Sequence, residues 1–241
     1  MWNRVDLKMR GKAAFRRNYW SGVGTALVLA LLAGGVGGLG TSVNVNVNGT
    51  LQIDGKTITS ENALYNLIYS GILLTGMIVM LLGTIYTIFV GNVISAGGCR
   101  YFTQNQTEPA RAGTIFSLFK GGNYLNVVLT MFMMNLFIFL WSLLLLIPGI
   151  VKYYSYRMVP YILAENPSMD WHEAMNISKR MMQGKKWKTF VYDLSFIGWY
   201  ILNMFTFGLL AIFYLNPYKL AADAEIYTAN REIAFAEGYI Q

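Results

Sequence analysis

Two ionisable residues lie inside apolar stretches near the C-terminus and are the first candidates for chemistry. Asp193 falls within the stretch 187–207, and Lys219 falls within the stretch 208–226. Ionisable side chains at membrane depth are costly, so they often mark proton or ion sites. If the two stretches form neighbouring antiparallel helices, Asp193 and Lys219 can meet as a buried ion pair. Two interpretations follow: mutual neutralisation that fixes helix packing, which we favour, and a proton- or ion-linked site in a transporter.

A second group of side chains, cationic and aromatic, follows a Pro-Gly pair. Pro148 and Gly149 are expected to end or sharply kink the apolar helix before them. The group after this helix break comprises Lys152, Tyr153, Tyr154, Tyr156 and Arg157. Such a patch can bind an anionic lipid or a peptide carboxylate. Snorkelling cations and interfacial aromatic rings explain the same residues as membrane anchors without a ligand, and we favour anchoring.

Residue types that commonly carry catalysis are scarce. The chain has one cysteine, Cys99, and one histidine, His172, so the sequence allows no intramolecular disulfide and no multi-histidine or cysteine metal cluster. It also lacks a phosphate-binding G-x-x-x-x-G-K-[ST] loop. We therefore expect no enzymatic activity, no metal and no cofactor.

The elements that position these residues are indicated by composition. Of the 241 residues, 55% are hydrophobic and 13% are charged, whereas soluble domains carry about 25% charged residues. The segments 62–98 and 121–151 contain no Asp, Glu, Lys or Arg. Apolar runs of about 18 residues or more are long enough to span a bilayer as a helix. The sequence therefore predicts an all-α integral membrane protein, with residues 1–241 forming a single membrane domain.

The net charge of +7 does not indicate nucleic-acid binding, because the basic residues flank apolar segments and no nucleic-acid-binding motif is present. Residues 1–19 contain six basic residues and one acid. Within them Trp2, Val5, Met9 and Ala13 recur at helical spacing. This pattern predicts either an interfacial helix on an anionic membrane surface or a solvated basic flank that only sets orientation.

Residues 41–62 form a polar connection with a different pattern. Residues 43–47 and 51–53 alternate in polarity with period two, and Asn48-Gly49 between them is a strong turn signal. We expect a short extracytoplasmic β-hairpin in this loop.

Residues 168–188 are predicted to form an amphipathic cytoplasmic helix. Asp170 can cap its N-terminus, with Glu173 placed as the partner in a capping box. One face collects the apolar and small residues Trp171, Ala174, Met175, Ser178, Met181 and Met182. The C-terminal end of this helix is basic.

The distribution of Lys and Arg sets the orientation, since these residues accumulate in cytoplasmic loops. Segments 1–19, 99–123 and 165–189 contain six, three and five of them, whereas 41–62 contains only Lys56. Placing the first three segments inside predicts about six transmembrane helices with both termini cytoplasmic. The segment 151–163 is short and basic, and it either spans fully or is re-entrant.

Several segments together resemble a known family. They are Leu146–Tyr156, Pro160–Pro167, Leu194–Trp199 and Asn216–Tyr218, supported by Glu173-Ala174, Ser178, Gly184-Lys185, Asp6–Lys8 and Asn18–Trp20. The set resembles an uncharacterised family of bacterial membrane proteins that is labelled only as a domain of unknown function. That family is similar to the membrane domain of some glycerophosphodiester phosphodiesterases. The resemblance implies a six-helix, multipass protein of the bacterial plasma membrane, without the phosphodiesterase activity, which belongs to a separate soluble domain.

Two functional hypotheses follow from the sequence. The first is a non-enzymatic scaffold or accessory protein that binds membrane lipids, anionic ones above all, or another membrane protein. The alternative is a small transporter or channel with a polar cavity near the Pro148-Gly149 break. Nucleic acid is not an expected partner of either. Asp193 is not part of the family pattern, which further favours a packing role for this residue.

Overall fold

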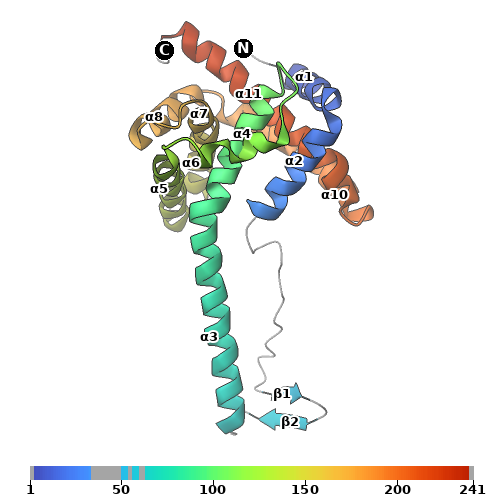
Figure 1. Cartoon of the computed structure of the whole chain (residues 1–241), viewed down its shortest axis with the longest axis vertical. Helices are drawn as coiled ribbons and strands as arrows, with labels where there is room; N and C mark the ends of the chain where they lie inside the picture. Colours follow the sequence, from blue (N-terminus) through green and yellow to red (C-terminus); the bar gives the residue numbers. More distant parts are fainter. Residues whose placement is uncertain (1–2, 34–49, 54–55, 60–62, 239–241) are drawn as a thin grey trace.

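The computed structural model describes residues 3–33, 50–53, 56–59 and 63–238, and these residues form helices and one pair of short strands (Figure 1). The N-terminal half contains α1 (Arg4–Arg17), α2 (Tyr19–Leu32), β1 (Thr50–Ile53), β2 (Lys56–Thr59), α3 (Ala63–Tyr86), the π-helix η2 (Thr87–Gly91), α4 (Asn92–Gln104) and the 3-10 helix η3 (Ala112–Phe119). The C-terminal half contains α5 (Tyr124–Leu144), α6 (Leu146–Tyr156), α7 (Val159–Glu165), α8 (Trp171–Met181), α9 (Lys186–Leu194), α10 (Ile197–Phe205), the π-helix η4 (Ala211–Leu215) and α11 (Asn216–Ala236).

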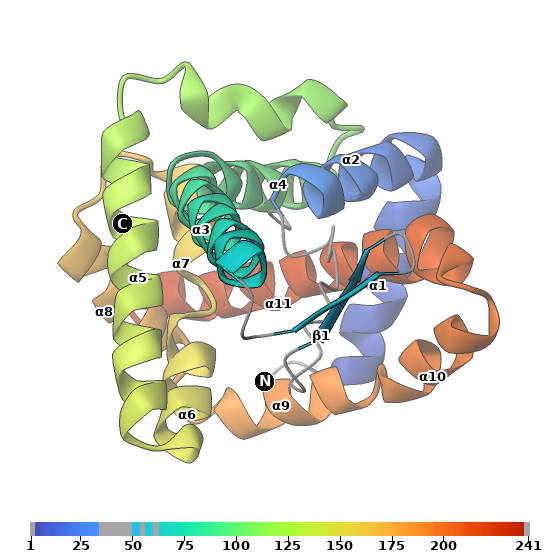
Figure 2. The ribbon, with the colours of Figure 1, turned by 90° about the horizontal axis from the view of Figure 1, so that it is seen from below.

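Helix α3 projects alone from a body made of the other helices. Figure 2 looks nearly along α3, and α5, α10 and α11 run across this view. The 24 residues of α3 extend about 36 Å at 1.5 Å per residue, which exceeds the hydrocarbon core of about 30 Å. Through η2 the same helix continues into α4, which belongs to the body.

Two helices of the described chain are long and apolar enough to cross a membrane, Asn66–Gln104 and Tyr124–Leu144. The prediction of six spans is therefore not supported. Among the described residues, other apolar stretches form shorter helices: α2 has 14 residues, and the stretch 187–207 is divided between α9 and α10, which have nine each. Between α9 and α10 the Ser195 hydroxyl donates to the Tyr192 carbonyl oxygen at 2.5 Å, a local bond of the kind that competes with a continuous helix.

The two strands pair antiparallel, with Thr50 opposite Thr59 and Ile53 opposite Lys56. This pairing differs from the predicted hairpin, which placed the turn at Asn48-Gly49. That turn lies outside the described residues and precedes both observed strands. Alternation and a turn signal do not fix register when a second, equally suitable pairing lies a few residues downstream.

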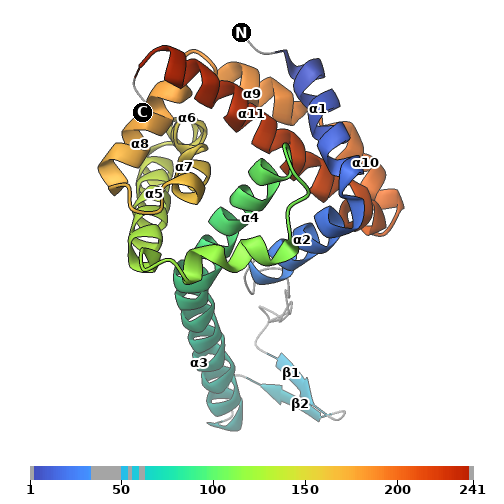
Figure 3. The same ribbon diagram turned by 45° about the horizontal axis from the view of Figure 1, so that its top comes forward.

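Helix α1 uses one face for packing and leaves the other exposed. Leu7, Gly11, Ala14 and Phe15 are buried, and α1 lies against α11 (Figure 3). A Cβ at Gly11 would lie 2.6 Å from the Ala222 Cα, so the two helices cross in close contact there. The stripe predicted from the sequence lies on the other side, where Val5 and Met9 are 54% and 60% exposed.

The amphipathic face predicted for residues 168–188 packs into the body. Ala174, Met175, Ser178, Met181 and Met182 are all buried. The Asp170 side chain accepts a hydrogen bond from the His172 amide at 2.9 Å and so caps α8. The helix is shorter than predicted, because the chain turns through Gly184 at φ +70° before α9 begins.

The predicted helix break at Pro148-Gly149 is displaced. The chain reverses at Leu145, which is extended (φ −158°, ψ 141°), and Pro148 lies inside the first turn of α6. Proline is tolerated there because the amide hydrogens of a first turn have no intrahelical acceptor. Gly149 lets α6 pack on α5: a Cβ at this position would lie 2.2 Å from the Ser142 Oγ. The Pro-Gly pair thus starts a helix instead of ending one.

Candidate functional site

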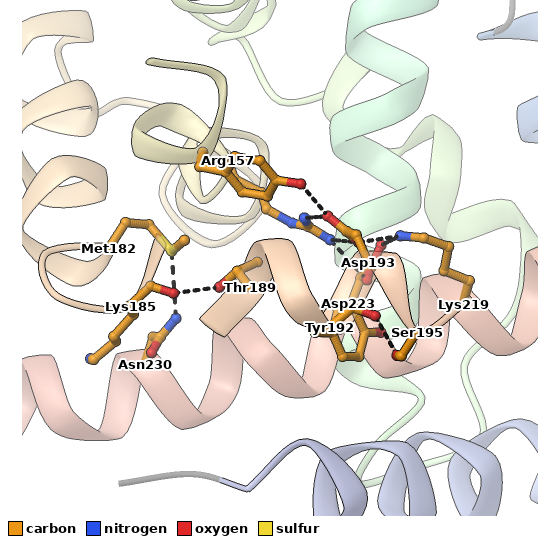
Figure 4. Close-up of polar contacts among 11 residues, drawn as sticks. Arg157, Met182, Lys185, Thr189, Tyr192, Asp193, Ser195, Lys219, Asp223 and Asn230 are labelled. Atoms are coloured by element: carbon orange, nitrogen blue, oxygen red, sulfur yellow. Dashed lines mark hydrogen bonds and ion pairs between the residues drawn. The ribbon is translucent and has the colours of Figure 1, made fainter. Parts of the chain in front are cut away.

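Four charged side chains from three elements meet in the body of the protein (Figure 4). Arg157 follows α6, Asp193 belongs to α9, and Lys219 and Asp223 belong to α11. We call these four residues the charged cluster. With two acids and two bases, the cluster carries no formal net charge.

Each acid of the charged cluster contacts both bases. The Arg157 guanidinium donates through both terminal nitrogens to Asp193, with Nη2 at 3.1 Å from Oδ1, and through Nη2 to Asp223 Oδ1 at 3.0 Å. The Lys219 ammonium lies 3.2 Å from Asp193 Oδ1 and 2.8 Å from Asp223 Oδ2. The side chains are only 10–23% exposed. The pairs are therefore mutually neutralised and largely removed from solvent.

Two tyrosines border the charged cluster. The Tyr154 hydroxyl donates to Asp193 Oδ2 at 3.0 Å. Tyr192 is fully buried, with its hydroxyl beside the Asp223 carboxylate. Asp193 thus accepts hydrogen bonds from Arg157 and Tyr154 and forms an ion pair with Lys219, which leaves its carboxylate little capacity for a further ligand.

Helix α1 adds a fifth charge beside the cluster. The Lys8 ammonium donates to Ser195 Oγ at 2.5 Å and lies 4.1 Å from the centre of the Phe196 ring. Burial lowers the pKa of Lys8, and the charges of Arg4 and Lys219 act in the same direction. Lys8 therefore anchors α1 to the turn between α9 and α10 by a hydrogen bond and a cation–π contact.

The structure places the two residues of the predicted ion pair, Asp193 and Lys219, in contact. Sequence reasoning missed Asp223 and assigned Arg157 to a different group. A signal for Asp223 was present, because it lies four residues after Lys219 on one helix, the spacing at which opposite charges meet. No spacing rule connects Arg157 to the cluster, since its partners lie 36 and 66 residues away.

The cationic and aromatic patch predicted at 152–157 is not one surface. Tyr154 and Arg157 turn toward Asp193. Tyr156 is buried, at 2% exposure, whereas Tyr153 is 51% exposed. Lys152 faces the Trp141 ring, 4.5 Å from its centre. The first four of these residues belong to α6, and Arg157 continues it with helical backbone angles, so residues one and two apart point in different directions.

A further polar group lies at the end of α7. Glu165 Oε2 accepts from the Tyr227 hydroxyl at 2.7 Å and from Arg231 Nε at 2.9 Å. These three residues border a cavity of about 310 Å³. They tie α7 to α11, as the charged cluster does for α6 and α9.

The described residues contain no group of three or more His, Cys, Asp or Glu side chains placed to hold a metal ion. Cys99, on α4, is a free thiol of intermediate exposure. What the site can do with its own groups is hold helices together through charge-assisted hydrogen bonds.

Comparison with protein families matches residues 143–233 to a family described as "Protein of unknown function (DUF975)". This segment runs from the end of α5 into α11 and contains all four residues of the charged cluster. No curated protein and no solved structure matches the chain. No comparison shows the expected similarity to the membrane domain of glycerophosphodiester phosphodiesterases.

Proposed function

We propose that this chain is a non-enzymatic accessory or scaffold protein of the bacterial plasma membrane that binds lipid or another membrane protein. The observation that carries the proposal is the exposed apolar surface of α3. Leu74, Met77 and Met80 are 60%, 69% and 76% exposed, and only 6% of the most apolar window of this helix is buried. Exposed apolar surface of this extent is unfavourable in water. Lipid chains or the helices of a partner would cover it.

The proposed topology has six apolar segments that enter the membrane. Both termini lie in the cytoplasm, as the distribution of basic residues indicates. We further propose that two helical hairpins turn inside the bilayer. The α5–α6 turn exposes Leu144 and Ile147 by 72% and 74%, and the α10–η4 turn exposes Phe205 and Phe207 by 77% and 97%. Such turns favour a position in the hydrocarbon. Each hairpin would then enter and leave the bilayer on the cytoplasmic side.

The charged cluster supports a packing role over transport. Its four charges balance, and each acid contacts both bases. The alternative, a transporter with a cavity at the Pro148-Gly149 break, gains no support from the packing there, because Gly149 is in close contact with Ser142. We therefore assign the cluster to the attachment of α6 and α9 to α11.

Photo-crosslinking along α3 tests the proposed function. A benzophenone amino acid is placed singly at successive positions from Leu73 to Leu82 in cells that produce the full chain. We expect protein adducts confined to one helical face, or lipid adducts around the whole helix, and the pattern identifies which of the two covers α3. The proposal is wrong if the purified protein in liposomes conducts ions or solutes and Asp193→Asn abolishes the flux.

Cysteine labelling tests the topology. In a Cys99→Ser background, single cysteines at Leu144 and Phe207 should resist membrane-impermeant maleimides from either side of the membrane. A cysteine at the exposed, polar-loop residue Arg111 should react from the cytoplasmic side only. Labelling of Leu144→Cys or Phe207→Cys from the outside would instead show that the hairpin crosses the bilayer.

A further inference from the structure

Three lysine side chains from different helices are connected through the Tyr156 ring and through the effect of their charges on one another. Lys152 belongs to α6, Lys179 to α8 and Lys186 to α9. The ammonium groups of Lys152 and Lys179 lie 6.0 Å and 5.6 Å from the centre of the Tyr156 ring. Burial lowers the pKa of Lys186, and the charge of Lys152 acts in the same direction. We call these residues the lysine triad.

The three ammonium groups of the lysine triad together carry three positive charges. In the described part of the chain, no salt bridge involves any of the three ammonium groups. Lys179 contacts a neutral acceptor, the Asn176 amide oxygen, at 3.3 Å. This differs from the charged cluster, where every cation has two carboxylate partners. A concentration of like charge without counter-charge favours the binding of an anion.

The surroundings of the lysine triad indicate which kind of anion. Trp141 lies under Lys152 at 4.5 Å, and Trp187, next to Lys186, is 72% exposed and stacks on Phe190 at 5.2 Å. Exposed Trp beside Lys is typical of the headgroup level of a membrane. The apolar α5–α6 turn begins three residues after Trp141, which places hydrocarbon-compatible surface next to the cations.

We propose that Lys152, Lys179 and Lys186 bind the phosphate-containing headgroup of an anionic phospholipid, whose acyl chains lie against the exposed α5–α6 turn. The inference rests on the proposed membrane location and names one lipid class and one site for it. Each basic residue near an anionic membrane surface strengthens binding several-fold. Removing two of the three cations should therefore weaken binding about tenfold or more.

The test compares two variants with the same change in net charge. Lys152→Gln/Lys186→Gln removes two cations of the lysine triad, and Arg111→Gln/Lys120→Gln removes two exposed cations elsewhere. The full-length proteins are titrated with phosphatidylglycerol in a phosphatidylcholine background, and bound lipid is counted by native mass spectrometry. Lys152→Arg/Lys186→Arg keeps the charge and should bind as the unaltered chain does. Thermal unfolding of each variant verifies that it is folded.

The expected result is about tenfold weaker phosphatidylglycerol binding in Lys152→Gln/Lys186→Gln and little change in Arg111→Gln/Lys120→Gln. Equal phosphatidylglycerol binding by both variants would show that the lysine triad is not the binding site. Displacement of phosphatidylglycerol by millimolar inorganic phosphate would overturn the lipid as ligand and assign the site to free phosphate. If the chain stays an integral membrane protein but shows no preference for phosphatidylglycerol, the inference fails and the proposed function stands. If it is extracted from membranes without detergent, the proposed function itself fails.

Discussion

Helices α3 and α11 are similar in length, with 24 and 21 residues, and have opposite environments. The apolar α3 carries no charged residue, yet almost none of its surface is covered by the described chain. The helix α11 contains five charged residues, yet it buries eleven residues and contacts α1, α2, α4 and α8. The hydrophobicity of a helix thus indicates whether its surface is compatible with lipid or with water. Small residues and fixed polar partners decide which helix the others pack on.

The largest expected effect comes from breaking the polar attachment of α11. Arg157→Met would leave Asp193 and Asp223 with Lys219 as their only cation within the charged cluster. Removing one partner of a buried pair costs about 3–5 kcal/mol, so the midpoint of thermal unfolding in detergent should fall sharply. Arg111→Met, at an exposed arginine, is the control. Equal midpoints for the two variants would show that the cluster does not hold the helices.

The next effect comes from placing a charge on α3. Met77→Arg should reduce membrane insertion, because an arginine near the centre of a spanning helix costs about 2.5–3.5 kcal/mol. The measurement is the fraction of newly made chain recovered in the membrane after alkaline extraction, with Met77→Leu as the matched control. Full insertion of Met77→Arg would indicate that α3 lies in water or beside a polar partner.

The close crossing of α1 over α11 gives a smaller effect. Gly11→Ala brings a methyl group against Ala222 and should cost about 1–3 kcal/mol through overpacking. Gly24→Ala, on α2, meets no atom within 4 Å and should be neutral or slightly stabilising, since alanine favours helices. The measurement is the midpoint of thermal unfolding of the two variants. A higher midpoint for Gly11→Ala would contradict the close contact between α1 and α11 at this position.

The smallest effect is expected from shortening a side chain on α3. Leu81 is 61% exposed, so Leu81→Ala should change the free energy of unfolding by less than about 0.5 kcal/mol. The same truncation at the buried Leu215 should cost about 2–5 kcal/mol. A large loss for Leu81→Ala in the purified protein would reveal a packing partner, such as a second copy of the chain.

The sequence was sufficient to predict the helical class and the contact of Asp193 with Lys219, because apolar runs and isolated charges are local signals. It did not predict where the helices end. Whether Pro148 closes one helix or opens the next depends on how α6 packs on α5, which no local pattern records. The position of Arg157 in the charged cluster likewise depends on contacts between residues far apart in the chain.

The contact between Gly11 and Ala222 also limits the order of folding, because it cannot form until α11 has been synthesised. Helix α1 precedes α11 in the chain by nearly 200 residues and is therefore synthesised well before it. The face of α1 that carries Leu7 and Phe15 therefore has no α11 to pack on while the residues between the two helices are synthesised. Such early exposed surface is prone to misassociation. A membrane surface or a chaperone that holds α1 during synthesis would protect it until α11 is made.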